Sequence, residues 1–353
     1  VAAHAIPAAH LLVFVDGRLT PGLSRPGRLP PGVVLGSLAE ALAANPPGLQ
    51  AALLGAEAPS AFADLNLALM ADGACLQLPP KTAVEAPIQW LFIATQGGLA
   101  IQPRNLILAA AGSSAAIVEH HVAVGEGRYL TNAVTDIRLG PAAAIEHHKL
   151  QQESPAAFHM ATVNVSQAAK SRFVSTSFAF GARLARVDIA VGLDAEGAAC
   201  TLDGLYLTDG RQHVDHHTRI DHRQGRCTSR QRYKGVLAGA SRAVFNGRVV
   251  VHPDAQGSDA FQANHNLLLS ENAEIDTKPQ LEIWADDVKC SHGATVGQLD
   301  EDQVFYLRSR GIAEADARAM LTRAFAMEII ERVGLPSVQD RLVELLPGKL
   351  PRQ

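Results

Sequence analysis

The sequence predicts a mainly β protein with helical segments at both ends, and three observations support this. From about residue 88 to 290, hydrophobic and polar residues alternate in many short runs separated by Gly, Asn and Asp, as in strands with one buried face. The first 87 residues mix strand and helix patterns. After residue 297, hydrophobic residues recur at helical spacing. We therefore expect an N-terminal mixed region (1–87), a β core (88–297) and a C-terminal helical domain (298–353).

The N-terminal region begins with a strand. Residues 11–15 are apolar and Asp16-Gly17 follows them, which predicts a tight turn because glycine tolerates a positive φ. Pro46-Pro47 separates two short segments that we expect to be helices. Their apolar residues recur at helical spacing, namely Leu35, Leu38 and Leu42 in the first segment and Phe62, Leu65 and Leu69 in the second.

The β core alternates most clearly at Ala161, Val163 and Val165. So many short strands fit a sandwich, a barrel or a solenoid. Asn and Gln inside strands favour the solenoid, where like residues stack between coils, although no repeat of fixed length is visible. We expect turns to contain three glycines, Gly235, Gly239 and Gly247.

The C-terminal region predicts three helices. Asp300 and Gln303 form an N-capping pattern, and Gly311 ends the first helix. The second helix covers residues 314–333 and ends before Gly334 and Pro336. Its apolar stripe consists of Met320, Ala324, Met327 and Ile330. Ser337 and Asp340 start the third, residues 338–346, and the stripe must be covered by the core or by a partner.

The composition argues against several classes of function. The net charge is -4 with both signs mixed, so we expect no nucleic-acid partner. Apolar runs fall far short of the roughly 20 residues of a membrane span, and no secretory signal is visible. No G-x-x-x-x-G-K-[ST] loop is present, so we expect no bound nucleotide. The widely spaced cysteines, without a C-x-x-C pair, favour the reducing cytoplasm: Cys75, Cys200, Cys227 and Cys290.

One candidate metal site lies in the histidine-rich stretch HVDHHTRIDH. His213, Asp215 and His217 alternate, so on a strand they share a face and could converge on a metal. The alternative, which we favour, is a solvated outer sheet surface. Adjacent pairs such as His120-His121 and His147-His148 are weaker candidates, because neighbouring strand residues point to opposite faces.

A second candidate is KCSHGATVG, where Cys290 and His292 share a face if the strand persists. A thiolate beside an imidazole could hold iron or an iron–sulfur cluster. By spacing alone, a buried cysteine with a surface histidine is the stronger interpretation. A Cys-His nucleophile would lack an orienting partner. An enzyme acting on polysaccharide would need paired carboxylates, and no pairing is discernible among Asp215, Asp221 and Glu282.

Residues 233–312, from YKGVLAGASRAVFNGRVVVHPD to DQVFYLRSRGI, closely resemble the C-terminal core of the SufB/SufD family of iron–sulfur cluster assembly proteins. Weaker resemblance extends upstream through HVDHHTRIDH to about residue 90 and includes LLVFVDGRL. The resemblance implies a right-handed parallel β-helix, or solenoid, flanked by helices.

The resemblance also implies a role. In CSHGAT, the functional histidine of the family maps onto His292, with Cys290 beside it. Gly293 follows His292 where the B type has a carboxylate, and Cys75 stands alone near the N-terminus, so the chain is most similar to the D type. Such a subunit would be non-catalytic in a SufBCD scaffold, with ATP hydrolysis left to SufC.

The implied partners are a SufB-type sister subunit and a SufC-type ATPase, or a second copy of this chain in isolation. Iron or an iron–sulfur cluster would be held transiently at Cys290 and His292 and shared with SufB. The ATPase would dock on the C-terminal helices through the apolar stripe of the second helix, or that stripe forms the internal core of the helical unit. A purely structural adaptor for SufC is the alternative function, followed by a polysaccharide-active β-helix.

Overall fold

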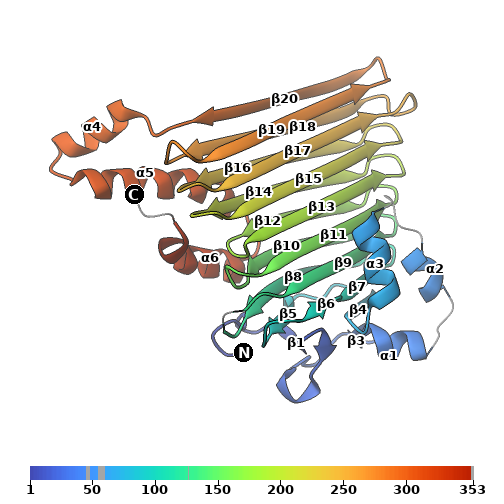
Figure 1. Ribbon diagram of the computed structural model, residues 1–353. Helices are drawn as coiled ribbons and strands as arrows, with labels where there is room; N and C mark the ends of the chain where they lie inside the picture. The colour runs from blue at the N-terminus through green and yellow to red at the C-terminus, as the bar shows by residue number, and fades with distance from the viewer. Residues whose placement is uncertain (45–47, 55–59, 126, 351–353) are drawn as a thin grey trace.

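The computed structural model describes residues 1–44, 48–54, 60–125 and 127–350. The chain winds into a parallel β-solenoid in which each coil contributes one strand to each of two sheets (Figure 1). Helices lie at both ends of the chain, outside the coil. The predicted β fold and the solenoid are therefore confirmed.

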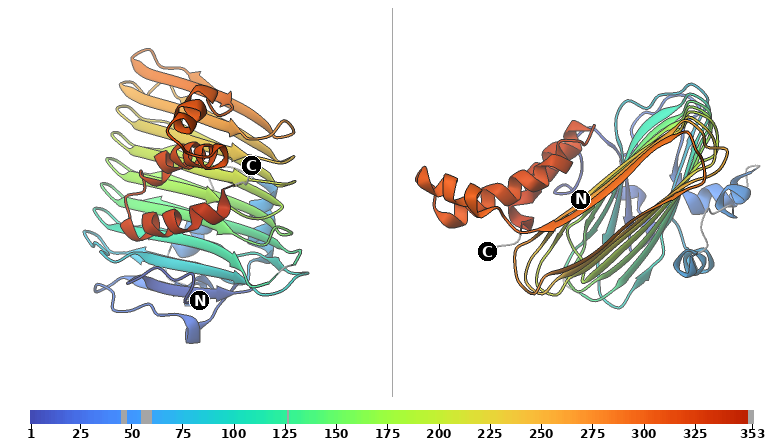
Figure 2. Two further views of the ribbon diagram at one scale, coloured as in Figure 1. Left: turned by 90° about the vertical axis from the view of Figure 1, so that its left-hand side faces the viewer. Right: turned by 90° about the horizontal axis from the view of Figure 1, so that it is seen from above.

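The two sheets face each other across the core (Figure 2). In spatial order, sheet A consists of β2 (Arg18–Leu19), β1 (His10–Val15), β5 (Ile88–Ala94), β8 (Ser114–Ala123), β10 (Ala144–Gln152), β12 (Arg172–Ala179), β14 (Ala199–Thr208), β16 (Thr228–Leu237), β18 (Ser258–Leu268) and β20 (Val288–Gly297). Sheet B consists of β19 (Glu274–Ile283), β17 (Arg242–Val251), β15 (His213–His222), β13 (Leu184–Leu193), β11 (Phe158–Gln167), β9 (Leu130–Leu139), β7 (Arg104–Ala109), β4 (Ala74–Leu78) and β3 (Val34–Ser37), and β6 (Ala100–Ile101) pairs with β9.

The core forms because inward residues of successive strands stack in register. Val163 of β11 pairs with Ile189 of β13, and both are buried in the main apolar cluster. The coils differ in length, since the step from Ala161 to Val187 is 26 residues and that from Ala243 to Ile275 is 32. This variation explains why the sequence shows no fixed repeat.

The N-terminal strand and its turn are confirmed. Asp16 and Gly17 have φ values of 49° and 82°, and the turn joins β1 to the antiparallel β2. The first expected helix is shorter than its pattern, because Leu35 belongs to β3. Ser37 caps α1 (Leu38–Ala43) by accepting a hydrogen bond from the Glu40 amide at 3.1 Å.

The second expected helix is α3 (Ala61–Leu69), but its apolar pattern does not mark the buried face. Phe62, Leu65 and Leu69 are exposed. Instead, buried Asn66 donates to the carbonyl oxygens of Pro103 and Asn132, at 3.0 and 2.8 Å. Polar contacts therefore tie this helix to the sheet. Pro46-Pro47 lies outside the described residues, and α2 (Leu49–Leu54) is an additional helix.

The helices cover the two outer faces of the solenoid (Figure 2). The N-terminal helices lie on sheet B above a buried ion pair between Arg104 and Asp136, 2.7 Å apart. The C-terminal unit consists of α4 (Glu301–Ser309), α5 (Glu314–Ile330) and α6 (Pro336–Lys349). Ala326, Ile329 and Ile330 of α5 share an apolar cluster with the outer face of sheet A. None of the helices in the described part of the chain is both long and apolar enough to cross a membrane.

The start of α4 agrees with the prediction, since the Asp300 carboxylate accepts a hydrogen bond from the Asp302 amide at 2.9 Å. Gly311, with a φ of 88°, follows this helix. The third helix begins earlier than expected. Its first residue is Pro336 and Leu335 is the N-cap, so Ser337 already lies inside the helix.

The predicted stripe of α5 is divided in the structure. Met320 and Ala324 are exposed, Met327 is partly buried, and Ile330 is buried against sheet A. Because successive helical residues turn by about 100°, Ile330 lies well round the helix from Met320, towards the buried Ala326. The helix therefore presents Met320 and Ala324 to solvent and uses Ile330 for its own docking.

Two of the three glycines expected in turns lie inside strands. Gly235 is in β16 and Gly247 is in β17, whereas Gly239, with a φ of 63°, does occupy a turn. A Cβ at Gly235 would lie 2.1 Å from Cε2 of Tyr206. The large buried side chains of the core therefore require strand positions without a side chain.

Candidate functional site

Cys290 and His292 lie on β20, the last strand of the solenoid. In the parallel register, Cys290 pairs with Ala260 and His292 with Gln262. Ala260 and Gln262 are fully buried inside the coil. Since paired residues of parallel strands point to the same face, the thiol and the imidazole both leave β20 on its inner side. They therefore lie together at the open end of the core.

This end of the solenoid is uncovered in the described structure. β20 pairs only with β18, and β19 pairs only with β17 (Figure 1). At the opposite end, the short antiparallel strands β2 and β3 close the two sheets. Ile283, Trp284 and Val296 near the open end are 42, 67 and 48% exposed. Long edges with free backbone groups and exposed apolar side chains are typical of a docking surface.

The cysteines differ in accessibility. Cys75, Cys200 and Cys227 are buried, whereas Cys290 is only partly buried, and all four are free thiols. Burial raises the pKa of the Cys290 thiol, so a metal must displace its proton. In the described part of the chain, no three His, Cys, Asp or Glu side chains come together as ligands of one metal ion. Cys290 and His292 therefore supply only part of a coordination shell.

The histidine-rich stretch forms β15, and its alternating residues lie on the outer face of sheet B. Asp215 is 2.9 Å from the imidazole of His217 and 2.7 Å from the guanidinium of Arg186. The carboxylate is thus already neutralised by protein groups. The stretch therefore lies on the outer sheet surface, as the alternative interpretation expects, but Asp215 is buried among its partners and not solvated. Its ion pairs do not favour a metal site of His213, Asp215 and His217.

The carboxylates that an acid–base enzyme would need are also held in ion pairs. Each pairs with an arginine and not with another carboxylate, in the pairs Asp215 with Arg186, Asp221 with Arg219, and Glu282 with Arg248. This arrangement offers no pair of carboxylates poised across a glycosidic bond.

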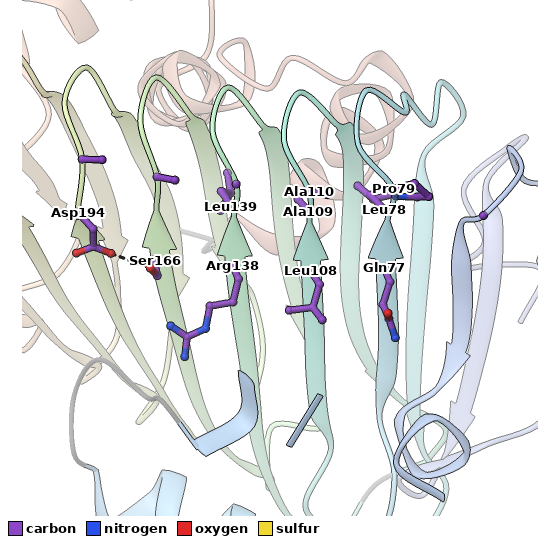
Figure 3. Close-up of a pocket in the computed structure, with 14 residues that line it drawn as sticks. Gln77, Leu78, Pro79, Leu108, Ala109, Ala110, Arg138, Leu139, Ser166 and Asp194 are labelled. Atoms are coloured by element: carbon purple, nitrogen blue, oxygen red, sulfur yellow. Dashed lines mark hydrogen bonds between the residues drawn. The ribbon is translucent and has the colours of Figure 1, made fainter. Parts of the chain in front are cut away.

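A shallow groove of about 700 Å³ lies on the first coils of sheet B. Figure 3 shows its side chains in a row along neighbouring strand ends, including Gln77, Leu108 and Arg138. Ser166 donates a hydrogen bond to Asp194 at 2.7 Å, and no histidine is among the described residues that line the groove. The groove therefore offers no nucleophile–base pair, and it lies on other strands than Cys290 and His292.

Sequence reasoning missed a charged cluster inside the solenoid. The buried Glu119 carboxylate accepts from the Lys149 ammonium at 2.5 Å, Thr135 at 2.8 Å, and the imidazoles of His121 and His147 at 2.8 and 3.1 Å. Burial alone would raise the pKa of Glu119, but the Lys149 charge and these hydrogen bonds hold that pKa well below its usual range. The cluster thus contains a buried, stabilised carboxylate.

The neighbouring pair of Glu153 and His159 extends this cluster. Their carboxylate and imidazole are 2.6 Å apart, and the rings of His159 and His121 meet edge to face at 4.9 Å. The signal in the sequence was the pair of double histidines. Because strand neighbours point to opposite faces, only the inner member of each pair reaches the cluster, namely His121 and His147.

These features define a class of protein: a parallel β-solenoid with helices docked on both outer faces and a thiol–imidazole pair at its uncovered end. Comparison with known families identifies it further. Residues 92–325 match the family model described as SUF system FeS cluster assembly, SufBD core domain, and residues 7–90 match the SufBD protein N-terminal region. The chain therefore belongs to the SufB/SufD family of iron–sulfur cluster assembly proteins, and it is SufD-like.

Individual relatives agree with this assignment. The chain is 36% identical to the iron–sulfur cluster assembly SufBD family protein slr0076 of Synechocystis, over 96% of this chain and 77% of the relative. It is 38% identical to the iron–sulfur cluster assembly protein SufD of Escherichia coli, over 69% of this chain and 57% of the relative. A chloroplastic protein of Arabidopsis thaliana, ABCI7, is 34% identical over 78% of this chain and 60% of the relative. The matches thus span less than two thirds of the last two proteins.

Proposed function

We propose that this chain is the SufD-type subunit of a SufBCD scaffold in the cytoplasm, where it supports iron acquisition and new cluster formation at its interface with a SufB-type subunit. The observation that carries the proposal is the position of Cys290 and His292. They lie on the inner face of the edge strand β20, whose side away from β18 pairs with no strand of the described structure, so a second solenoid could continue the sheet there.

The donor set supports a shared site. A thiolate and an imidazole suit iron, which would be cargo passing through the scaffold. Because no third His, Cys, Asp or Glu side chain completes a metal site in the described part of the chain, the SufB-type partner would supply the remaining ligands. Cys290 must lose its proton and His292 must be neutral when they bind, so acid weakens the site.

The C-terminal helices supply the second contact, with a SufC-type ATPase. Their outer surface carries Phe305, Tyr306 and Met320, which are 70, 58 and 51% exposed. Exposed aromatic and methionine side chains are enriched where proteins dock. The chain itself would bind no nucleotide and remain non-catalytic, with ATP hydrolysis by the partner.

The test is copurification with SufB-type and SufC-type partners, followed by anaerobic reconstitution and ultraviolet-visible spectroscopy. We expect His292→Ala to leave the three subunits associated but to lower the bound iron and the cluster absorbance. His252→Ala is the matched control, because His252 is a partly exposed histidine that contacts Asp221 at 3.3 Å, on the outer face of sheet B. Equal iron in His292→Ala and the parent would refute the ligand role.

A purely structural adaptor is the second candidate, and the well-docked helical unit favours it. Under that function, both His292→Ala and Cys290→Ser would keep full cluster content, and only changes on the C-terminal helices would abolish assembly. The same reconstitution therefore separates the two functions.

A further inference from the structure

His292 ends a row of inward-facing residues that runs along the solenoid axis. Leu202, Gln231, Gln262 and His292 occupy matching positions on β14, β16, β18 and β20. Gln231 and Gln262 are both fully buried. Glutamines inside a core need partners for their amides, since a buried polar group without a hydrogen-bond partner destabilises the fold.

The amides of these glutamines form a row of hydrogen bonds in which each amide donates in the same direction, away from His292. The Gln231 amide donates to the hydroxyl of Thr218, and Nε2 of Gln262 donates to Oε1 of Gln231 at 2.7 Å. Gly247 on the facing strand β17 makes room for this arrangement, because a Cβ there would lie 1.9 Å from Nε2 of Gln262. The orientation of the Gln262 amide is thus fixed from two sides.

The last acceptor of this row of hydrogen bonds has no partner in the described structure. Oε1 of Gln262 is buried and accepts no hydrogen bond from any residue in the described part of the chain. The next residue in the row is His292, on the neighbouring strand, about 4.8 Å away along the sheet. Imidazole and amide side chains in register at this spacing can hydrogen-bond directly.

We propose that Gln262 is a positioning residue for His292: its Oε1 accepts the ring N–H and thereby directs the other ring nitrogen, with its lone pair, towards the subunit junction. A neutral imidazole has one donor and one acceptor nitrogen, and an amide oxygen can only accept. The contact therefore selects one tautomer. This inference rests on the proposed role of His292 as an iron ligand.

The expected effect on iron is large. Groups that accept the second N–H of a ligand histidine orient the ring, and their loss typically lowers metal affinity about 10–100-fold. The hydrogen bonds from Gln262 to Gln231 and from Gln231 to Thr218 hold the Gln262 amide in one orientation and make it a rigid acceptor. Removing that acceptor should weaken iron binding without separating the subunits.

The direct test is nitrogen-15 NMR of the histidine rings in the full chain without metal, at a pH where the imidazole is neutral. We expect His292 to show one dominant tautomer in the parent and a mixture in Gln262→Leu. Asn264→Leu is the control: Asn264 is equally buried on β18 but pairs with Ala294, so it should leave the His292 signals unchanged. The same His292 tautomer in Gln262→Leu and the parent overturns the proposal.

A second measurement uses Fe²⁺ alone as the probe on the assembled complex. Gln262→Leu should bind Fe²⁺ at least about tenfold more weakly than the parent and the Asn264→Leu control. If His292→Ala weakens Fe²⁺ binding and Gln262→Leu does not, the positioning role is wrong. If His292→Ala has no effect on iron, the proposed function itself fails, while the NMR result still decides whether Gln262 and His292 interact.

Discussion

The buried carboxylate Glu119 makes Lys149→Met a sharp test of the solenoid core. Both side chains are at most 2% exposed, and the ammonium is 2.5 Å from Oε1. The substitution removes the Lys149 ammonium from this carboxylate and leaves hydrogen bonds from Thr135 and two imidazoles. Breaking a buried pair from one side typically costs about 3–5 kcal/mol, because an uncompensated charge remains.

The assay is thermal unfolding of the full chain at pH 7.5. At about 2 °C per kcal/mol for a chain of this size, we expect the melting temperature of Lys149→Met to fall by roughly 6–10 °C. The double variant Lys149→Met with Glu119→Gln should recover part of this loss, because it removes the charge that lost its partner. The deficit of the single variant should also shrink in acid, where the unpaired Glu119 takes up a proton.

A fall of less than about 2 °C for Lys149→Met, or a double variant no more stable than the single one, would refute this reasoning. Either result would mean that the carboxylate is already protonated or solvated in the parent. Lys289→Met, on an exposed position of β20, is the matched control and should leave the melting temperature unchanged.

Three further predictions concern pH, packing and docking. Burial lowers the pKa of His216 from 6.5 to about 4, so this imidazole stays neutral in the native state at a pH where it is protonated in the unfolded state. The contribution of the neutral imidazole to the free energy of unfolding is full above about pH 6.5, and up to about 3 kcal/mol is lost as the pH falls towards 4. A melting temperature unchanged between pH 7 and 4.5 would contradict this. Gly235→Ala should lower the free energy of unfolding by about 1–3 kcal/mol, whereas Gly293→Ala, which meets no atom within 4 Å, should be neutral by the same melting assay. Met320→Glu should weaken binding of the SufC-type ATPase about tenfold in a titration without changing the melting temperature. Ile330→Asp should lower both the affinity for the ATPase and the melting temperature. Equal binding by Met320→Glu and the parent would exclude the surface around Met320 as the docking site of the ATPase.

Much of the fold was predictable from the sequence because alternation within strands is a local property. Val163 and its neighbours predicted a half-buried strand, and Asp16-Gly17 predicted the hairpin turn that the structure contains. Coil length and strand pairing are not local. Coils of 26 and 32 residues leave no repeat to detect, so the strand pattern only favoured the solenoid over a sandwich or a barrel, and the family resemblance was needed to choose it.

The predictions from the sequence were wrong where tertiary contacts overrode local patterns. Gly235 sits in a strand because Tyr206 on the neighbouring strand needs its space, which no local rule shows. The apolar face of α3 is exposed because Asn66 makes the buried contacts instead. The candidate pair of Cys290 and His292 could be named from sequence, but its place at an uncovered edge, beside Gln262, required the register of β18 and β20.

The central claim is that the open end of the solenoid is completed by another subunit. Hydrogen–deuterium exchange of the amides in β20 (Val288–Gly297), measured with and without a SufB-type partner, tests it most directly. We expect slowed exchange across this strand in the complex, with little change in the interior strand β14 (Ala199–Thr208). Unchanged exchange in β20 within an assembled complex would show that the partner binds elsewhere and that Cys290 and His292 do not meet it.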